Sequence, residues 1–580
     1  MNELKRTITV FLLLPLMLFV VFTGCVSNDT YMVEMRDGVK LATDVYLPDE
    51  NILSHGTLLI RTPYNKNDMK LTGIQWSQAG WPVVIQDMRG RYASEGIDTV
   101  FRNAHTDGPD TLSWIANQSF CNGEIATFGG SALGINQYYM AGANPDFLAC
   151  QYIQVATPDM YKHAIFQGGQ FRYSLVAWWL EGQGSTYILE DYFAHENFTM
   201  DYWGNVSLDG KWDQVQVPAI HIGGWYDCFA QGTIDGFMGY QYQGGDGALG
   251  KSKLIMGPWT HGGGRKQGEL LYPENAEDNF SFYMFIDMIE QYTMDTGNHF
   301  DKWPAVSYYV MGDVDNESAP GNEWLTAEDW PVPYETVPIY LCKDGSLQTT
   351  LDSESTSISY SYDPTDPAPT IGGQNLNDNI IKRGPYDQCI IEDRDDVLVF
   401  TSEVLSDPLW IAGPLRARLF VSSNCPDTDF TVKLTDVYPD GRSMLIADGI
   451  LRMRNRHGFD HWEFMESSEI YEIEIDLWST AYIFNKDHRI RISVSSSNAP
   501  RFLPNPNTIA PLAQNTSFAI AENTVYLGES YPSSFYLPVV SLHFEKEKQD
   551  SNDVLFSLRN ACKKRQLITG IETMKTIKDQ

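Results

Sequence analysis

One stretch, residues 125–134, limits most strongly the folds that this chain can adopt. It reads Ile-Ala-Thr-Phe-Gly-Gly-Ser-Ala-Leu-Gly, so an apolar run ends in two glycines, a serine and small helix-compatible residues. That order is typical of a strand that turns sharply into a helix. A serine at such a turn is pushed out of the backbone path, where a base can reach its hydroxyl. Taken alone, the G-x-S-x-x-G spacing fits a surface turn equally well.

Short apolar runs alternate with helical segments on both sides of this stretch. This alternation predicts a mostly parallel sheet covered by helices on both faces, with ligands at the carboxyl ends of the strands. We expect residues 31–306 to form this α/β unit. The runs that predict its strands lie at 58–60, 82–86, 125–130, 147–153, 219–222 and 253–256.

A long insertion, residues 154–217, separates two of these strands. It is rich in aromatic residues, and their spacing is helical and not alternating. A segment of this length is also too long for an irregular loop without secondary structure. We interpret it as a helical cap that encloses an apolar pocket over the strand ends. Trp178 and Trp179 are its candidate pocket residues.

The pattern changes at about residue 307. Short β-rich runs recur between Gly, Pro, Asp and Asn turns, which predicts an all-β sandwich or jelly roll over 307–544. The tail, 545–580, loses the strand pattern, and we expect it to be a loose helix or disordered.

The N-terminus has the pattern of a targeting segment. Lys5 and Arg6 precede an apolar run, 8–24, and Cys25 follows it. Residues 1–25 resemble a lipoprotein signal in which Cys25 becomes lipidated and attaches the protein to a membrane. An ordinary cleaved signal and an uncleaved anchor are the alternatives. All three predict an exported protein.

Composition excludes several classes of function. The 580 residues carry a net charge of -34, which argues against nucleic-acid partners because phosphate backbones need Lys and Arg surfaces. The other seven cysteines form no C-x-x-C pair, so no metal motif is visible, and no nucleotide motif appears either. We therefore expect no cofactor. The oligomeric state is not readable from the sequence.

A nucleophilic serine needs a base, and the base needs an acid that orients it. Two later strands supply candidates, since 220–227 ends in Asp227 and 254–261 ends in His261. With Ser131, they follow the chain order serine, acid, histidine that is usual when a serine sits on a strand-to-helix turn.

With these residues, the sequence resembles the cocaine-esterase-like family of serine hydrolases, which also contains X-Pro dipeptidyl peptidases and α-amino acid ester hydrolases. The resemblance covers about residues 31–544 and implies an α/β-hydrolase domain, a helical cap and a C-terminal jelly-roll-like domain. The matching stretches are Arg-Thr-Pro-Tyr at 61–64, Gln-Asp-Met-Arg-Gly-Arg at 86–91, Gly-Gly-Ser-Ala-Leu-Gly at 129–134, Gly-Gly-Trp-Tyr-Asp at 223–227 and Gly-Pro-Trp-Thr-His at 257–261.

The resemblance implies a role for each matching residue. Ser131 would be the nucleophile, His261 the base and acid, and Asp227 the carboxylate that orients the imidazole. The backbone N–H of Ala132 and the phenol of Tyr64 would bind the oxyanion.

The substrate is predicted less sharply. Amino-ester hydrolases of the family carry carboxylates just after the catalytic aspartate to bind a substrate ammonium, whereas here Cys228 and Phe229 follow. We expect a small ester of an apolar or aromatic acid, bound by Phe229, the cap tryptophans and Trp259. One alternative is an X-Pro dipeptidyl peptidase or an amide or β-lactam acylase, which would act on a short peptide or amide. Another is an inert surface-binding lipoprotein, in which the β domain binds carbohydrate or a partner and the hydrolase unit is inactive.

Overall fold

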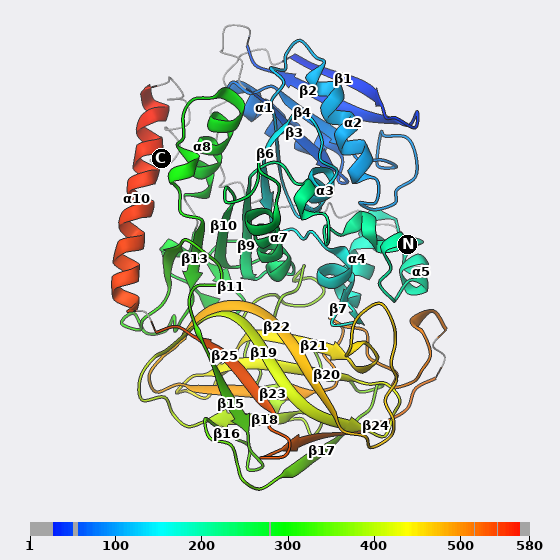
Figure 1. Cartoon of the computed structure of the whole chain (residues 1–580), viewed down its shortest axis with the longest axis vertical. Coiled ribbons are helices and arrows are strands. Elements are labelled where there is room, and N and C mark those ends of the chain that lie inside the picture. Colours follow the sequence, from blue (N-terminus) through cyan, green and yellow to red (C-terminus); the bar gives the residue numbers. More distant parts are fainter. Residues whose placement is uncertain (1–26, 50–55, 278–279, 515–516, 542, 569–580) are drawn as a thin grey trace.

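The computed structural model describes residues 27–49, 56–277, 280–514, 517–541 and 543–568. An α/β part and an all-β part lie against each other, and a long C-terminal helix flanks the first of them (Figure 1). The predicted fold classes are confirmed. The predicted signal segment and Cys25 lie outside the described residues. In the part of the chain that the structure describes, no helix is long and apolar enough to cross a bilayer.

The α/β part is built on a ten-stranded sheet in the order β1-β2-β4-β3-β5-β6-β9-β10-β13-β14. Every neighbouring pair from β4 to β13 is parallel, and only the outer pairs are antiparallel. The inner strands are buried along their whole length because helices cover both faces. The strands are β1 (Ser27–Glu34), β2 (Lys40–Leu47), β3 (Thr57–Thr62), β4 (Val83–Asp87), β5 (Ile125–Gly130), β6 (Leu148–Gln154), β9 (Ala219–Tyr226), β10 (Lys253–Thr260), β13 (Val306–Val310) and β14 (Glu323–Ala327).

Helices lie on both faces of this sheet. Successive strand residues point to opposite faces, and Phe128 of β5 packs on Trp76 and Phe285 while its neighbour Thr127 hydrogen-bonds Gln137. Trp76 and Phe285 belong to α1 and α8, and Gln137 belongs to α3, so the two helix layers are separated by the sheet. The helices are α1 (Lys70–Gln78), α2 (Ala104–Ala116), α3 (Ala132–Ala141), α7 (Ala230–Gln243) and α8 (Ser281–Met294).

The segment between β6 and β9 forms the predicted cap. It is mainly helical, as expected, and a hairpin of two-residue strands precedes its longest helix. Its elements are η2 (Tyr161–Ile165), β7 (Phe166–Gln167), β8 (Gln170–Phe171), α4 (Tyr173–Gln183), α5 (Ile188–Ala194), α6 (Met200–Trp203), η3 (Gly204–Val206) and η4 (Trp212–Gln214).

The all-β part is one mostly antiparallel eleven-stranded sheet. β22 pairs with β19, but it also packs across β21 without pairing with it, so the sheet folds over into two layers. Its strands are β15 (Glu335–Leu341), β16 (Ser346–Gln348), β17 (Thr356–Tyr362), β18 (Leu398–Ser402), β19 (Leu409–Ser423), β20 (Asp429–Val437), β21 (Ser443–Arg452), β22 (Tyr471–Phe484), β23 (Arg489–Ser495), β24 (Ala521–Leu527) and β25 (Ser534–Val539), with a short helix α9 (Cys389–Glu392).

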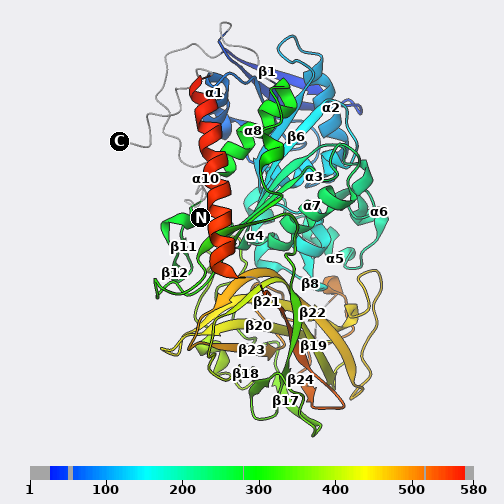
Figure 2. The ribbon, with the colours of Figure 1, turned by 60° about the vertical axis from the view of Figure 1, so that its left-hand side comes forward.

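One predicted boundary is wrong, whereas the described part of the tail forms a helix, which is one of the two alternatives expected for it. The change of pattern near residue 307 does not end the first domain, because β13 pairs in parallel with β10 and β14 completes the same sheet. The tail contains a regular helix, α10 (Phe544–Ile568), which runs back along the α/β part (Figure 2). It packs on β14, where the Oγ of Ser551 accepts a hydrogen bond from the backbone N–H of Thr326 at 2.9 Å. Packing on this sheet edge orders a segment that has no strand pattern of its own.

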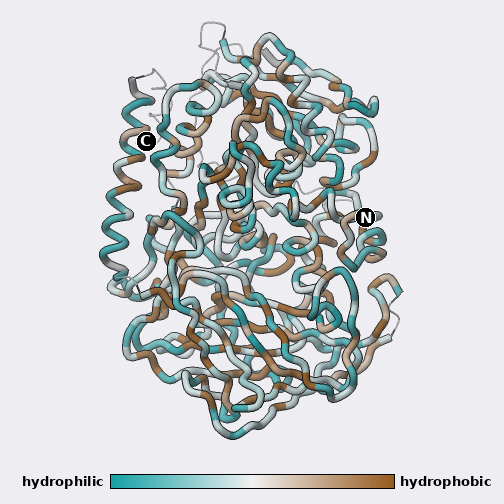
Figure 3. Tube along the Cα trace, viewed as in Figure 1, coloured by the Kyte–Doolittle hydropathy of each residue, from teal (hydrophilic) through white to brown (hydrophobic). Residues whose placement is uncertain are grey.

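The two parts share one apolar core, which appears as brown segments inside both halves of Figure 3. Hydrogen bonds also cross their boundary: the Tyr226 hydroxyl donates to the Leu445 carbonyl at 3.0 Å, and the side-chain amide of Gln374 donates to the Trp225 carbonyl at 3.0 Å. Both contacts lie at the carboxyl end of β9. The β domain therefore packs directly against the strand ends that carry the candidate site.

Candidate active site

Ser131 stands between β5 and α3 in a strained backbone conformation, with φ 55° and ψ −127°. The surrounding glycines permit this turn. A Cβ on Gly129 would lie 2.5 Å from the Leu133 Cβ, and one on Gly134 would lie 2.8 Å from the Ala156 Cβ. The N–H of Ser131 is held by the Gln154 carbonyl at 2.9 Å. The unusual glycine spacing thus reflects the close approach of α3 to β6.

The structure brings the three predicted side chains together. The Ser131 hydroxyl lies 3.0 Å from Nε2 of His261, and Nδ1 of the same ring lies 2.6 Å from a carboxylate oxygen of Asp227. Because an ionised carboxylate only accepts, Nδ1 carries the proton and donates it to Asp227. Nε2 is then free to accept a hydrogen bond from the serine hydroxyl.

The acid and the base come from neighbouring parallel strands. Asp227 follows β9, is fully buried, and accepts the backbone N–H of Phe229 at 2.7 Å, which fixes its orientation. His261 follows β10 after a register irregularity between Gly257 and Thr260. Burial alone would lower the pKa of His261, but Cys228 and Asp227 beside the ring outweigh it and raise the pKa above 6.5.

Tyr64 follows β3 and reaches the same place. Its phenol oxygen accepts the indole N–H of Trp179 at 3.0 Å and interacts with the side chain of Ser131. Burial is the main cause that raises the pKa of this phenol, so the group remains a neutral O–H donor. The N–H of Ala132, in the first turn of α3, has no acceptor within its helix. Both predicted oxyanion donors therefore lie beside Ser131.

An apolar cavity of about 50 Å³ opens at Ser131. By a measure in which one water needs roughly 10–15 Å³, it has room for about four waters or a small acyl group. None of its lining residues in the described part of the chain carries a charge. Its walls include Phe101, Leu175, Val176, Trp179, Tyr192 and Phe229.

The predictions for the pocket walls are only partly right. Trp179 and Phe229 line the cavity, but Trp178 and Trp259 do not. Trp178 directly precedes Trp179 on α4, and adjacent helix residues do not share a face. Trp259 is turned away, since its indole donates to the Ala276 carbonyl at 2.8 Å and packs on Trp324.

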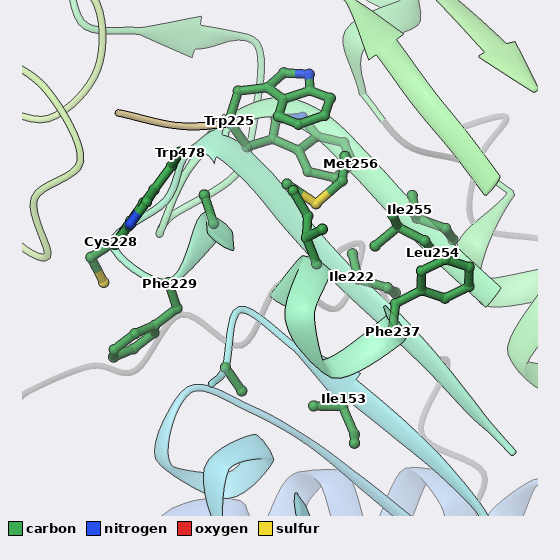
Figure 4. Close-up of a cluster of buried hydrophobic side chains, with 14 of the residues drawn as sticks. Ile153, Ile222, Trp225, Cys228, Phe229, Phe237, Leu254, Ile255, Met256 and Trp478 are labelled. Atoms are coloured by element: carbon green, nitrogen blue, oxygen red, sulfur yellow. The ribbon is translucent and has the colours of Figure 1, made fainter. Parts of the chain in front are cut away.

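Sequence reasoning missed two contributors to the site. Leu376 enters the cavity wall from a loop of the β domain, and nothing in its local sequence indicates this. The sequence marks Cys228 only as a non-acidic residue after Asp227, yet its Sγ lies 3.5 Å from Nδ1 of His261. Cys228 and Phe229 lie just past the carboxyl end of β9 in Figure 4, near Trp478 of the β domain. Within the described ranges, Asp227, Cys228 and His261 are the one group of three or more metal-ligating side chains with ligand atoms this close, all within 4.8 Å.

A serine on a strand-to-helix turn, hydrogen-bonded to an imidazole that is oriented by a buried carboxylate, is the arrangement of a serine hydrolase. Comparison with known proteins gives the family. Residues 37–187 and 174–263 match the X-Pro dipeptidyl-peptidase (S15) family, and residues 298–535 match the X-Pro dipeptidyl-peptidase C-terminal non-catalytic domain. The chain belongs to this family of serine hydrolases.

Individual relatives agree with this assignment. Cocaine esterase from Rhodococcus sp. (strain MB1 Bresler) is 32% identical, over 88% of this chain and 98% of its own length. Two solved structures share the fold. An aminopeptidase from a marine-sediment Thaumarchaeota archaeon is 24% identical with a TM-score of 0.78, covering 90% of this chain and 98% of the aminopeptidase. An α-amino acid ester hydrolase is 23% identical with a TM-score of 0.77, covering 93% of this chain and 100% of the hydrolase.

Proposed function

We propose that the protein is a carboxylic ester hydrolase that cleaves esters of small apolar acids through an acyl-serine intermediate. The observation that carries this proposal is the cavity at Ser131, whose described lining is apolar apart from the serine hydroxyl and the Tyr192 phenol. A site of this kind favours an uncharged acyl group because burying a charge without a partner is costly.

The geometry supports a definite sequence of steps. The Ser131 oxygen attacks the ester carbonyl while Nε2 of His261 takes its proton, and Asp227 stabilises the resulting imidazolium. The Ala132 N–H and the Tyr64 hydroxyl donate to the oxygen that becomes negative. His261 then returns the proton to the leaving alcohol. A water molecule, activated by the same ring, releases the acid from Ser131.

An aminopeptidase or amino-ester hydrolase needs an acid that binds the substrate ammonium. The cap carries three acids on α4 and α5 that a substrate ammonium could approach: Glu181, Glu190 and Asp191. All three side chains are exposed, and none lines the cavity. Phe229 instead lies edge-on to His261, with the ring centres 5.8 Å apart, and presents an apolar surface beside the base. The ester is therefore the better substrate class, and the X-Pro peptidase is the second candidate.

Two chromogenic substrates test the proposal directly. Purified protein is given p-nitrophenyl esters of short fatty acids or benzoic acid and, separately, an X-Pro p-nitroanilide. We expect hydrolysis of the esters, with a loss of about 10⁴- to 10⁶-fold in kcat for Ser131→Ala, and no labelling of that variant by a fluorophosphonate. Hydrolysis of the anilide alone would favour the peptidase. Equal labelling of wild type and Ser131→Ala would contradict the proposed nucleophile.

We also propose that the protein is exported. The support is the charged and apolar pattern of residues 1–25, with Cys25 as the first residue after processing if the signal is of the lipoprotein type. The mass of the N-terminal peptide from a membrane fraction of the native host would check this. An unprocessed N-terminus on protein from the cytoplasm would contradict it.

A further inference from the structure

The Nδ1 edge of His261 faces a second potential ligand besides Asp227. The Cys228 sulfur lies 3.5 Å from Nδ1, and the Asp227 oxygen lies 2.6 Å from the same nitrogen. Cys228 is a fully buried free thiol, Asp227 is fully buried, and the His261 side chain is 13% exposed. Thiolate, imidazole and carboxylate are the ligand types that Zn²⁺ takes in proteins.

We propose that Asp227, Cys228 and His261 form an inhibitory site for a thiophilic divalent cation of the Zn²⁺ or Cd²⁺ type. In zinc sites the Zn–S bond is about 2.3 Å long and the Zn–N bond about 2.0 Å. At a tetrahedral angle these bonds hold sulfur and nitrogen about 3.5 Å apart, which is the distance between Cys228 Sγ and His261 Nδ1. With Zn–O and Zn–N bonds of about 2.0 Å at the same angle, the carboxylate oxygen would lie about 3.3 Å from Nδ1. Its present distance is 2.6 Å, so binding requires it to move away by less than about 1 Å. A water molecule would complete the four ligands.

The charges and protons of this binding step balance. Cys228 loses its proton to solvent, and the ring proton of His261 moves from Nδ1 to Nε2, so one proton is released for each cation bound. The thiolate and the carboxylate together neutralise the dication. The nearby guanidinium of Arg172, which donates to the Cys228 carbonyl at 2.8 Å, then faces a site without net charge.

The bound cation stops the proposed chemistry in two ways. It replaces the hydrogen bond between Asp227 and His261, and it leaves Nε2 protonated, so that the ring cannot accept the proton of Ser131. The predicted inhibition therefore rests on the proposed roles of these residues, whereas binding of the cation does not. Hard cations such as Mg²⁺ and Ca²⁺ prefer oxygen ligands and are not expected to bind.

The test uses the purified full chain as wild type, Cys228→Ser, Ser131→Ala and the control Cys389→Ser, which alters a free cysteine in the β domain. Cd²⁺ is titrated while the ultraviolet thiolate-to-metal charge-transfer band is recorded. Separately, Zn²⁺ is added to the p-nitrophenyl ester assay of wild type, Cys228→Ser and Cys389→Ser. Each of these three is compared with its own metal-free rate, and EDTA is then added.

We expect one strong Cd²⁺ site with a thiolate band in wild type, Cys389→Ser and Ser131→Ala, and loss of that band in Cys228→Ser. Zn²⁺ should inhibit wild type reversibly, and Cys228→Ser should need at least about tenfold more Zn²⁺. An unchanged band or unchanged Zn²⁺ sensitivity in Cys228→Ser would overturn the proposal. If the wild-type protein hydrolysed none of the esters but still showed the Cd²⁺ band, the proposed function would be refuted and the cation site would remain supported.

Discussion

At the scale of single residues, the hydrogen bond from Trp179 to Tyr64 links the cap to a proposed oxyanion donor. The Trp179 N–H donates a hydrogen bond to the phenol oxygen at 3.0 Å. The phenol proton therefore points away from Trp179 and is available to another acceptor. We expect Tyr64→Phe to lose about 10²–10³ in kcat with little change in KM, because that donor acts only on the developing charge. Trp179→Phe keeps the apolar wall and should lose less, about fivefold, because it removes one neutral hydrogen bond of ~1 kcal/mol. Steady-state kinetics with one p-nitrophenyl ester measures both. A Tyr64→Phe enzyme with wild-type kcat would exclude the phenol as a donor.

The raised pKa of His261 predicts the pH dependence of catalysis. Only the neutral imidazole can accept the serine proton, and Cys228 and Asp227 favour the charged form. The rising limb of kcat/KM should therefore have its midpoint above pH 6.5, with activity increasing toward alkaline pH. A pH profile measured at constant ionic strength checks this. A midpoint at or below pH 6.5 would mean that burial dominates at this ring.

At the scale of the element, the approach of α3 to β6 sets the position of Ser131. A Cβ on Gly134 would meet the Ala156 Cβ at 2.8 Å and the carbonyl oxygens of Gln154 and Gly129 at 3.1 and 3.2 Å. Gly134→Ala should therefore displace the start of α3, cost about 1–3 kcal/mol of stability and lower kcat. Gly204→Ala is the matched control, because its new Cβ would meet only the flexible end of Met200. Thermal unfolding and ester turnover are compared for both variants. Equal effects would argue against the steric account.

Sequence patterns at this scale predict which strands exist better than how they pair. Ser131, Asp227 and His261 could be placed because each directly follows an apolar run, and parallel strands bring such ends to one edge. The run that forms β13 looks the same whether it closes one sheet or opens another, so the sequence pattern predicts a domain boundary that precedes the end of the first sheet. Trp259 was misplaced because an irregular end of β10 decides the direction of its indole, which no periodicity records.

At the scale of the whole molecule, His488 joins the two parts of the chain. Its Nδ1 lies 2.9 Å from Asp436 of β20, and its Nε2 lies 3.5 Å from Asp313, which follows β13. Burial opposes the charged ring, but these two carboxylates raise the pKa of His488 to about 9. Because the folded pKa lies above the unfolded one near 6.5, the ion pairs stabilise the fold fully below pH 6.5, and the gain is lost as the pH rises through 9.

The corresponding experiment measures the free energy of unfolding of wild type and His488→Gln between pH 6 and pH 10. The difference between them should be largest near pH 6, shrink as the pH rises from about 6.5 to 9, and be nearly absent above pH 9. A gap that stays constant over this range would mean that the ring contributes through packing alone.

The loop that carries Leu376 has a consequence for any exchange of parts among relatives. This side chain belongs to the β domain but forms a wall of the cavity at Ser131, and Arg172 of the cap donates to the Gln374 carbonyl of the same loop at 3.2 Å. A chimera that receives a foreign β domain would thus inherit a foreign wall of the cavity at Ser131. If the proposed function holds, two domains of one chain jointly set the substrate preference, and recombining them is a route to new selectivity that leaves Ser131, Asp227 and His261 unchanged.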